Sequence, residues 1–120
     1  MDLDDYQRNV KKTAAKYRSK EKTIMTWGLG IVGEAGDVAS CIKKTYSQGD
    51  DQIKGVRENL GDTMWYVAMI CNFYGWSLDE VLDENIEKLS KRYPKGFFTY
   101  EHARRDGKRI DWNEGNIQGG

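Results

Sequence analysis

Apolar residues recur at helical spacing from the start of the chain. In residues 2–18 they share one face of a helix, and acidic residues near its beginning suit the positive end of the helix dipole. The opposite face is basic, which we interpret as ordinary solvated surface. The pattern predicts a first helix over residues 2–18, with an apolar stripe made of Leu3, Tyr6, Val10, Ala14 and Tyr17.

The second predicted helix, residues 22–46, contains the glycines 28, 30, 33 and 36. Each glycine inside a helix costs about 0.5–1 kcal/mol relative to alanine, so we expect close packing of a neighbouring helix or ligand to offset it. Three of these glycines match the G-x-G-x-x-G pattern of dinucleotide-binding proteins. That fingerprint requires a preceding strand and a βαβ unit, whereas the chain downstream has a helical pattern, so we reject this interpretation.

Two further helices follow. The third, over residues 52–74, has a middle that is apolar on nearly all sides, which predicts a buried central helix ended by Gly75. A capping box that starts at Ser77 begins the fourth helix, which ends near Tyr93 because the residue before Pro94 avoids helical backbone angles.

The pattern as a whole predicts an all-α fold with four helices. We expect one helical domain over residues 1–96. Residues 97–120 form a C-terminal extension that is irregular or a short hairpin, turning at Asp106 and Gly107, and that packs on the domain or on a neighbouring subunit.

Composition excludes several classes of protein. The 120 residues carry 19 basic and 19 acidic side chains, and a net charge of zero argues against a nucleic-acid binder. No stretch approaches the roughly 18 apolar residues of a membrane span, and the acidic N-terminus does not resemble a secretory signal. Two cysteines and one histidine cannot complete a tetrahedral zinc site, and they predict a reduced, cytoplasmic setting.

Two groups of acidic residues are the main candidates for chemistry. Glu34 and Asp37 lie on one helix face among small residues, and Glu58, Asn59 and Asp62 open the apolar part of the third helix. Carboxylates from two helices that face each other make an oxygen-only site, which suits Mg²⁺. The alternative is that these residues are ordinary helix-end charges and surface ion pairs.

The fourth helix adds a polar residue and two cations. Asn85 interrupts an apolar stripe, and Lys88 and Arg92 lie close to the same side. This combination suits a phosphate-bearing ligand. A boundary asparagine beside surface cations explains the pattern equally well.

Three motifs together carry a resemblance to a known family. Residues 28–37 read GLGIVGEAGD, residues 59–66 read NLGDTMWY and residues 85–94 read NIEKLSKRYP. In this order and spacing, residues 3–97 resemble the MazG-like nucleotide pyrophosphohydrolases, which belong to the all-α NTP pyrophosphatases and fold as a four-helix bundle.

The resemblance implies a Mg²⁺ site, with Mn²⁺ as an alternative ion, in which the metal ligands are Glu34, Asp37, Asn59 and Asp62. The family usually has glutamate at the position of Asn59, and an asparagine ligates through its carbonyl oxygen without adding charge. Glu58 lies next to it as an auxiliary carboxylate, although it points about 100° away around the helix.

The resemblance also implies the reaction, which is hydrolysis of a nucleoside or deoxynucleoside triphosphate to the monophosphate and pyrophosphate. Glu34 is the candidate acceptor of the attacking water's proton. Trp27 or Trp65 is a candidate for stacking on the base, and packing in the core is the alternative role of either ring. The remaining candidate substrate contacts are Lys44, Asn85, Lys88 and Arg92. We expect a homodimer or homotetramer that binds neither nucleic acid nor membrane.

Two other functions remain open at the level of sequence. One is the related phosphoribosyl-ATP pyrophosphohydrolase activity. The other is a non-catalytic, oligomeric helical binding module whose acidic patch holds an ion, an interpretation that Asn59 favours because it removes a charge from the site. Release of pyrophosphate from a nucleotide separates the enzymes from the binding module.

Overall fold

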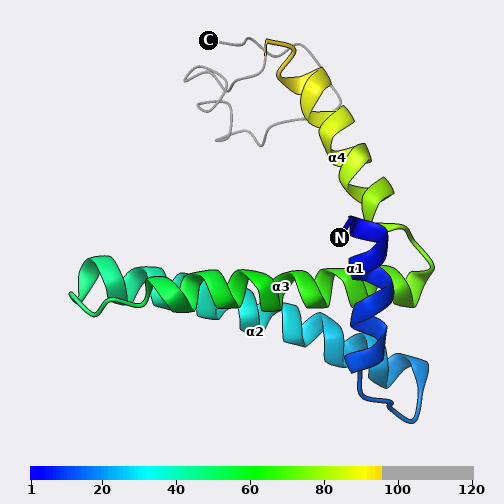
Figure 1. Cartoon of the computed structure of the whole chain (residues 1–120), viewed down its shortest axis with the longest axis horizontal. Helices are drawn as coiled ribbons and strands as arrows, with labels where there is room; N and C mark the ends of the chain where they lie inside the picture. The colour runs from blue at the N-terminus through cyan, green and yellow to red at the C-terminus, as the bar shows by residue number, and fades with distance from the viewer. Residues whose placement is uncertain (96–120) are drawn as a thin grey trace. The chain divides into compact units, whose positions relative to one another are not determined.

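The computed structural model describes residues 1–95, and that part of the chain contains four α-helices and no strand. The all-α prediction is therefore confirmed. The elements are α1 (Leu3–Val10), the 3₁₀ turn η1 (Lys11–Thr13), α2 (Lys20–Ser47), α3 (Ile53–Tyr74) and α4 (Leu78–Arg92) (Figure 1). The predicted C-terminal extension, with its turn at residues 106–107, lies outside the described residues.

The chain forms two compact units, Met1–Leu78 and the part from Asp79 onward, and each is described here by itself. Among the described residues, no helix combines the length and the apolar character that a membrane span requires. The first unit holds α1, α2 and α3, and the described part of the second is α4.

Helix α1 begins as its sequence suggests but ends early. It is capped by Asp2, whose carboxylate accepts a hydrogen bond from the Asp5 backbone N–H at 2.8 Å. The prediction of one helix over residues 2–18 is wrong beyond this short segment, because after η1 the chain takes an extended conformation at Ala14 and again at Ser19, the N-cap of α2. The Thr13 hydroxyl donates to the Val10 carbonyl at 2.8 Å and accepts from the Trp65 indole at 2.8 Å, which fixes the chain where it leaves the helical path.

Helices α2 and α3 lie side by side as a long antiparallel hairpin (Figure 1). Gly49 has a positive φ of 67° in the connecting loop, and the backbone N–H of Gln52 donates to the Thr45 hydroxyl at 2.9 Å to close the turn. Gly75 ends α3 with a φ of 73°, as predicted.

Two glycines allow the hairpin helices to approach closely. A Cβ atom on Gly30 would overlap the ring of Tyr66, and one on Gly55 would lie 2.8 Å from the sulfur of Cys41. Close packing against the glycine-rich stretch of α2 is therefore confirmed at Gly30. At the other three glycines, residues 28, 33 and 36, a Cβ would meet nothing within 4 Å in the described part of the chain.

The core of the first unit is aromatic. Trp27 is only 8% exposed and makes edge-on contacts with Trp65 and Phe73, at ring-centroid distances of 6.4 and 6.3 Å. The middle of α3 is less completely buried than predicted. Ala68 and Met69 are buried, but Met64 is 36% exposed. One face of α3 faces the core, and the other remains at the surface of the single chain.

Gln7 fastens α1 to the end of α3. Its side-chain N–H groups donate to the Asn72 side chain at 2.9 Å and to the Trp76 carbonyl at 2.7 Å, and its side-chain oxygen accepts from the Leu78 backbone N–H at 2.8 Å. Asn72 in return donates to the Gln7 carbonyl at 3.1 Å. These bonds position α1 on the hairpin although its apolar face is short.

Helix α4 carries the charge distribution that its dipole favours, with acidic residues in the first turn and basic residues in the last. Its bounds, Leu78–Arg92, agree with the prediction from the capping box and from Pro94. Lys91 and Glu87 form an exposed ion pair at 3.4 Å, whereas Arg92 is fully buried.

Candidate active site

An open pocket of about 410 Å³ lies between α2 and α3 and is bordered by η1. Glu34 enters it from α2 and Asp62 from α3, so the structure brings one residue of each predicted acidic group to the same place. The full lining is Thr13, Glu34, Asp62, Trp65 and Tyr66.

Glu34 is the electrostatic centre of this pocket. Partial loss of solvent raises the pKa of its carboxyl group, and the neighbouring carboxylates of Asp62 and Asp37 raise it further. Asp37 therefore belongs to the same negative cluster even though its own side chain is exposed. The negative charges of these three carboxylates repel one another, and a bound cation would reduce that repulsion.

Tyr6 of α1 lies close enough to Asp62 to interact with its charge. Burial raises the pKa of its phenol, and the charge of Asp62 raises it further, so the hydroxyl keeps its proton. The sequence pattern placed Tyr6 only on an apolar stripe, because the contact depends on how α1 crosses α3. Tyr66 follows Asp62 by four residues, so helical spacing alone predicts that its side chain lies on the same face of α3.

Asn59 lies at the interface between α2 and α3, where its amide N–H donates to the Cys41 sulfur at 3.6 Å. Cys41 follows Glu34 by seven residues and so shares its helix face. This hydrogen bond uses the side-chain nitrogen of Asn59, whereas a metal ion would be bound by the side-chain oxygen. Glu58 is exposed and is not among the residues that line the pocket.

The pocket fits an ion that takes only part of its coordination from the protein. In the described part of the chain, no three side chains of histidine, cysteine, aspartate or glutamate are grouped closely enough to hold a metal. Mg²⁺ typically keeps several waters and binds through one or two carboxylates together with substrate phosphates. Glu34 and Asp62 match that requirement, and the predicted ligand set of four residues stays a prediction.

The candidate substrate residues are spread over the fold. Trp27 is buried against Trp65, which itself borders the pocket. Lys44 is exposed and lies ten residues after Glu34, about 15 Å along α2. The candidates on α4 belong to the second unit, where Asn85 and Lys88 are exposed and Arg92 is buried, and their roles stay predictions.

Comparison with known proteins identifies the family. The family model of the MazG nucleotide pyrophosphohydrolase domain matches residues 21–97. The chain belongs to this family. The MazG match includes the whole of α3 and α4 and all but the first residue of α2, and therefore both acidic groups, whereas α1 and η1 lie before it.

A curated relative comes from a bacteriophage. Over 73 residues the chain is 37% identical to the Gene 37 protein of Mycobacterium phage L5, which covers 57% of this MazG chain. The chain spans 64% of the length of that relative. No solved structure matches this MazG protein.

The raised pKa of Glu34 predicts how stability depends on pH in the metal-free protein. The native state holds the Glu34 proton more tightly than the unfolded chain, so this contribution to stability is present at low pH. It is lost as the pH rises through the raised pKa. We expect Glu34→Gln to be more stable than the parent at neutral pH, by a margin that shrinks as the pH falls below the ordinary range of carboxyl groups. Thermal unfolding followed by circular dichroism in the presence of a chelator measures this margin, and a margin independent of pH would contradict the expectation.

Proposed function

We propose that this MazG-family protein hydrolyses nucleoside and deoxynucleoside triphosphates to the monophosphate and pyrophosphate with the help of Mg²⁺. The observation that supports this most strongly is the pairing of Glu34 and Asp62 in one pocket, with Asp37 close enough to add its charge. Such a cluster favours a divalent cation and, through it, the phosphates of a nucleotide.

The proposed mechanism gives each pocket residue a separate task. The environment that raises the pKa of Glu34 makes it a stronger proton acceptor, and in this role it takes a proton from the attacking water. Asp62 and Asp37 hold the negative charge that the ion requires. When bound, Mg²⁺ supplies charge neutralisation at the phosphates and lowers the pKa of the water. The hydroxyl groups of Tyr6 and Tyr66 serve as hydrogen-bond donors to the phosphates.

The decisive assay compares pyrophosphate release with orthophosphate release from a panel of nucleotides in the presence of Mg²⁺ or Mn²⁺. We expect pyrophosphate and a nucleoside monophosphate in equal amounts. Hydrolysis of phosphoribosyl-ATP alone would assign the related enzyme instead. No pyrophosphate from any nucleotide, with folded protein that still binds Mg²⁺, would favour the non-catalytic ion-binding module. That module remains the second candidate because Asn59 stands where the family usually has an acid.

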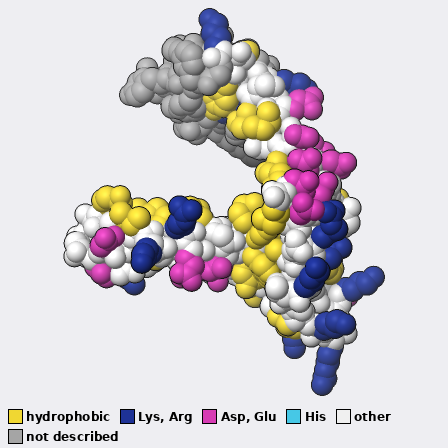
Figure 2. Space-filling view, viewed as in Figure 1, with side chains coloured by type: hydrophobic (Ala, Val, Ile, Leu, Met, Phe, Trp, Pro, Cys, Tyr) yellow, Lys and Arg dark blue, Asp and Glu magenta, His cyan; other side chains and the backbone are white. Residues whose placement is uncertain are grey.

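We also propose that the active form is a homo-oligomer, as a dimer or a tetramer. The hairpin presents large hydrophobic side chains at its surface (Figure 2). On α2, Met25, Leu29 and Val32 are 64%, 72% and 68% exposed and lie on one helix face. Gly36 continues this face with open space around it, so that another copy can approach closely. A second chain would cover apolar area that a single chain leaves in water.

Placing a charge on this face is expected to break the oligomer. Val32→Glu would bury an unpaired carboxylate between copies, which is strongly unfavourable, so we expect the mass in solution to fall to that of one chain. Sedimentation velocity measures this, with Gln48→Glu in the exposed loop as the matched control. An unchanged mass for the Val32 variant would exclude this face as the interface.

A further inference from the structure

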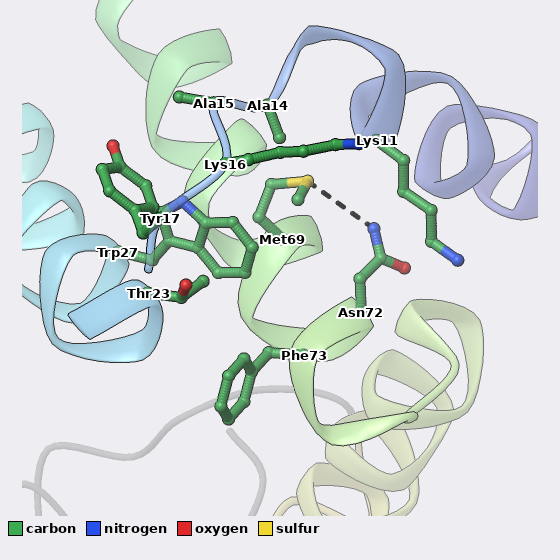
Figure 3. Close-up of a pocket in the computed structure, with 10 residues that line it drawn as sticks. All are labelled: Lys11, Ala14, Ala15, Lys16, Tyr17, Thr23, Trp27, Met69, Asn72 and Phe73. Carbon is green, nitrogen blue, oxygen red and sulfur yellow. Dashed lines mark hydrogen bonds between the residues drawn. The ribbon is translucent and has the colours of Figure 1, made fainter. Parts of the chain in front are cut away.

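A second pocket in the first unit has a different chemical character. It measures about 450 Å³ and is formed by the segment after α1 together with α2 and α3. Its lining is aromatic and apolar, apart from two lysines and a few neutral polar groups. The residues are Lys11, Ala14, Ala15, Lys16, Tyr17, Thr23, Trp27, Met69, Asn72 and Phe73 (Figure 3).

The polar groups of this pocket differ in their hydrogen bonds and in their exposure to solvent. The hydroxyl of Thr23 already donates to the Ser19 carbonyl at 2.9 Å, and the Asn72 amide is engaged by Gln7 at both ends. The ammonium groups of Lys11 and Lys16 are exposed at the rim. Figure 3 shows them on one side of the pocket, with the rings of Tyr17, Trp27 and Phe73 on the other.

The two pockets are neighbours along the same hairpin. Trp27 precedes Glu34 by seven residues and Met69 follows Asp62 by seven, so both helices advance two turns, about 10 Å, from the acidic pocket to the aromatic one. The edge-on contact between Trp27 and Trp65 forms the partition between them. A step of this length is comparable to the distance from the phosphates of a nucleotide to its base.

The charge around the aromatic pocket is opposite to that of the acidic pocket. Residues 8–22 contain seven basic residues and one acid, Glu21, and Figure 2 shows basic side chains gathered where α1 ends and α2 begins. A positive surface beside the entrance raises the local concentration of a polyanion. The pockets thus offer carboxylates for a metal ion, rings for stacking and cations at the rim.

We propose that the aromatic pocket holds the base of the nucleotide whose phosphates lie at Glu34 and Asp62. This inference rests on the proposed function. The rings of Tyr17, Trp27 and Phe73 supply stacking and edge contacts for a flat, unsaturated ring system. Lysine ammonium groups only donate hydrogen bonds, so they suit bases that present carbonyl oxygens, which are guanine, cytosine, uracil and thymine, over adenine, which has none.

Substitutions at the rim test the assignment without disturbing the core. Tyr17 is 38% exposed and Lys16 is exposed, so neither side chain belongs to the buried core of the first unit. Lys12→Ala is the matched control, because Lys12 is also exposed but does not line the pocket. The substrates are dGTP and dATP, together with methyl triphosphate, which has the same phosphates but no base.

We expect Tyr17→Ala to raise KM for dGTP about tenfold or more, the effect of losing one stacking contact, while kcat/KM for methyl triphosphate is unchanged. Lys16→Ala should reduce the preference for dGTP over dATP, whereas Lys12→Ala, which removes the same charge outside the pocket, should leave that preference unchanged. Equal losses on all three substrates, or no loss on dGTP, would overturn the assignment of the base. Equal use of dGTP and dATP by the parent protein would overturn the role of the lysines.

A binding measurement separates failure of this inference from failure of the proposed function. The α,β-methylene analogue of dGTP cannot be cleaved at the bond in question, and its dissociation constant is measured by calorimetry. If the parent protein releases no pyrophosphate, the proposed function fails. Weaker binding of the analogue to Tyr17→Ala than to Lys12→Ala would still support the base pocket, and equal binding to both would overturn it.

Discussion

Glu34→Gln is expected to lower kcat for pyrophosphate release by about 100- to 10,000-fold, the range typical for loss of a general base. The substitution keeps the size of the side chain but removes both the proton acceptor and one of the two carboxylates in the pocket. It should also weaken Mg²⁺ binding, because Asp62 then faces the ion without its partner. Initial rates at saturating nucleotide over a range of Mg²⁺ concentrations separate the two effects.

Glu21→Gln provides the control for this experiment. Glu21 lies on the same helix, is exposed and precedes Glu34 by thirteen residues, about 20 Å along α2. Its replacement changes the net charge by the same amount without touching the pocket. A fully active Glu34 variant would remove Glu34 from the mechanism while leaving the family membership in place. Full recovery of its rate at high Mg²⁺ would restrict Glu34 to metal binding.

Gly30→Ala is expected to lower the free energy of unfolding by about 1–3 kcal/mol, the usual cost of inserting a methyl group into a packed interface. The new Cβ would overlap the Tyr66 ring, which would have to move away from α2. The same shift would displace a wall of the acidic pocket, so KM for the nucleotide should rise as well. Urea unfolding followed by tryptophan fluorescence measures the change in stability.

Gly61→Ala should have the opposite effect on stability. Gly61 is helical, but a Cβ there would meet nothing within 4 Å, so alanine should stabilise α3 by about 0.5–1 kcal/mol. In a Tyr66→Ala background, Gly30→Ala should cost much less stability than it does in the parent, because the ring that the new methyl group overlaps is then absent. Equal destabilisation with and without the Tyr66 ring would place the strain elsewhere.

The helices themselves followed from local signals. The long hairpin was predictable from hydrophobic spacing, Gly75 and the capping box at Ser77, because each acts through its own few residues. The end of α1 was not predictable in this way. It depends on the contact between Thr13 and Trp65, which are 52 residues apart in the chain.

The residues of the candidate site likewise include some that the sequence predicted and some that it did not. Glu34 and Asp62 were accessible from sequence because carboxylates among small and apolar residues stand out. Tyr6 and Thr13 were not, since only the packing of α1 and η1 on the hairpin brings Tyr6 near Asp62 and Thr13 to the pocket. The open space around glycines 28, 33 and 36 explains nothing within one chain and is consistent with the proposed interface between copies.

The family match begins at residue 21, just after the segment that carries Tyr6, Thr13 and Tyr17. The acidic residues proposed to bind the metal ion therefore belong to the part shared with the family, whereas the N-terminal segment lies outside the match and is held against α3 by hydrogen bonds of Gln7. If the N-terminal segment contributes to binding the base, part of the base selectivity is encoded in a different stretch of the gene from the acidic residues of the proposed metal site. Exchange of residues 1–19 between relatives would then change the preferred base while Glu34, Asp37 and Asp62 stay in place.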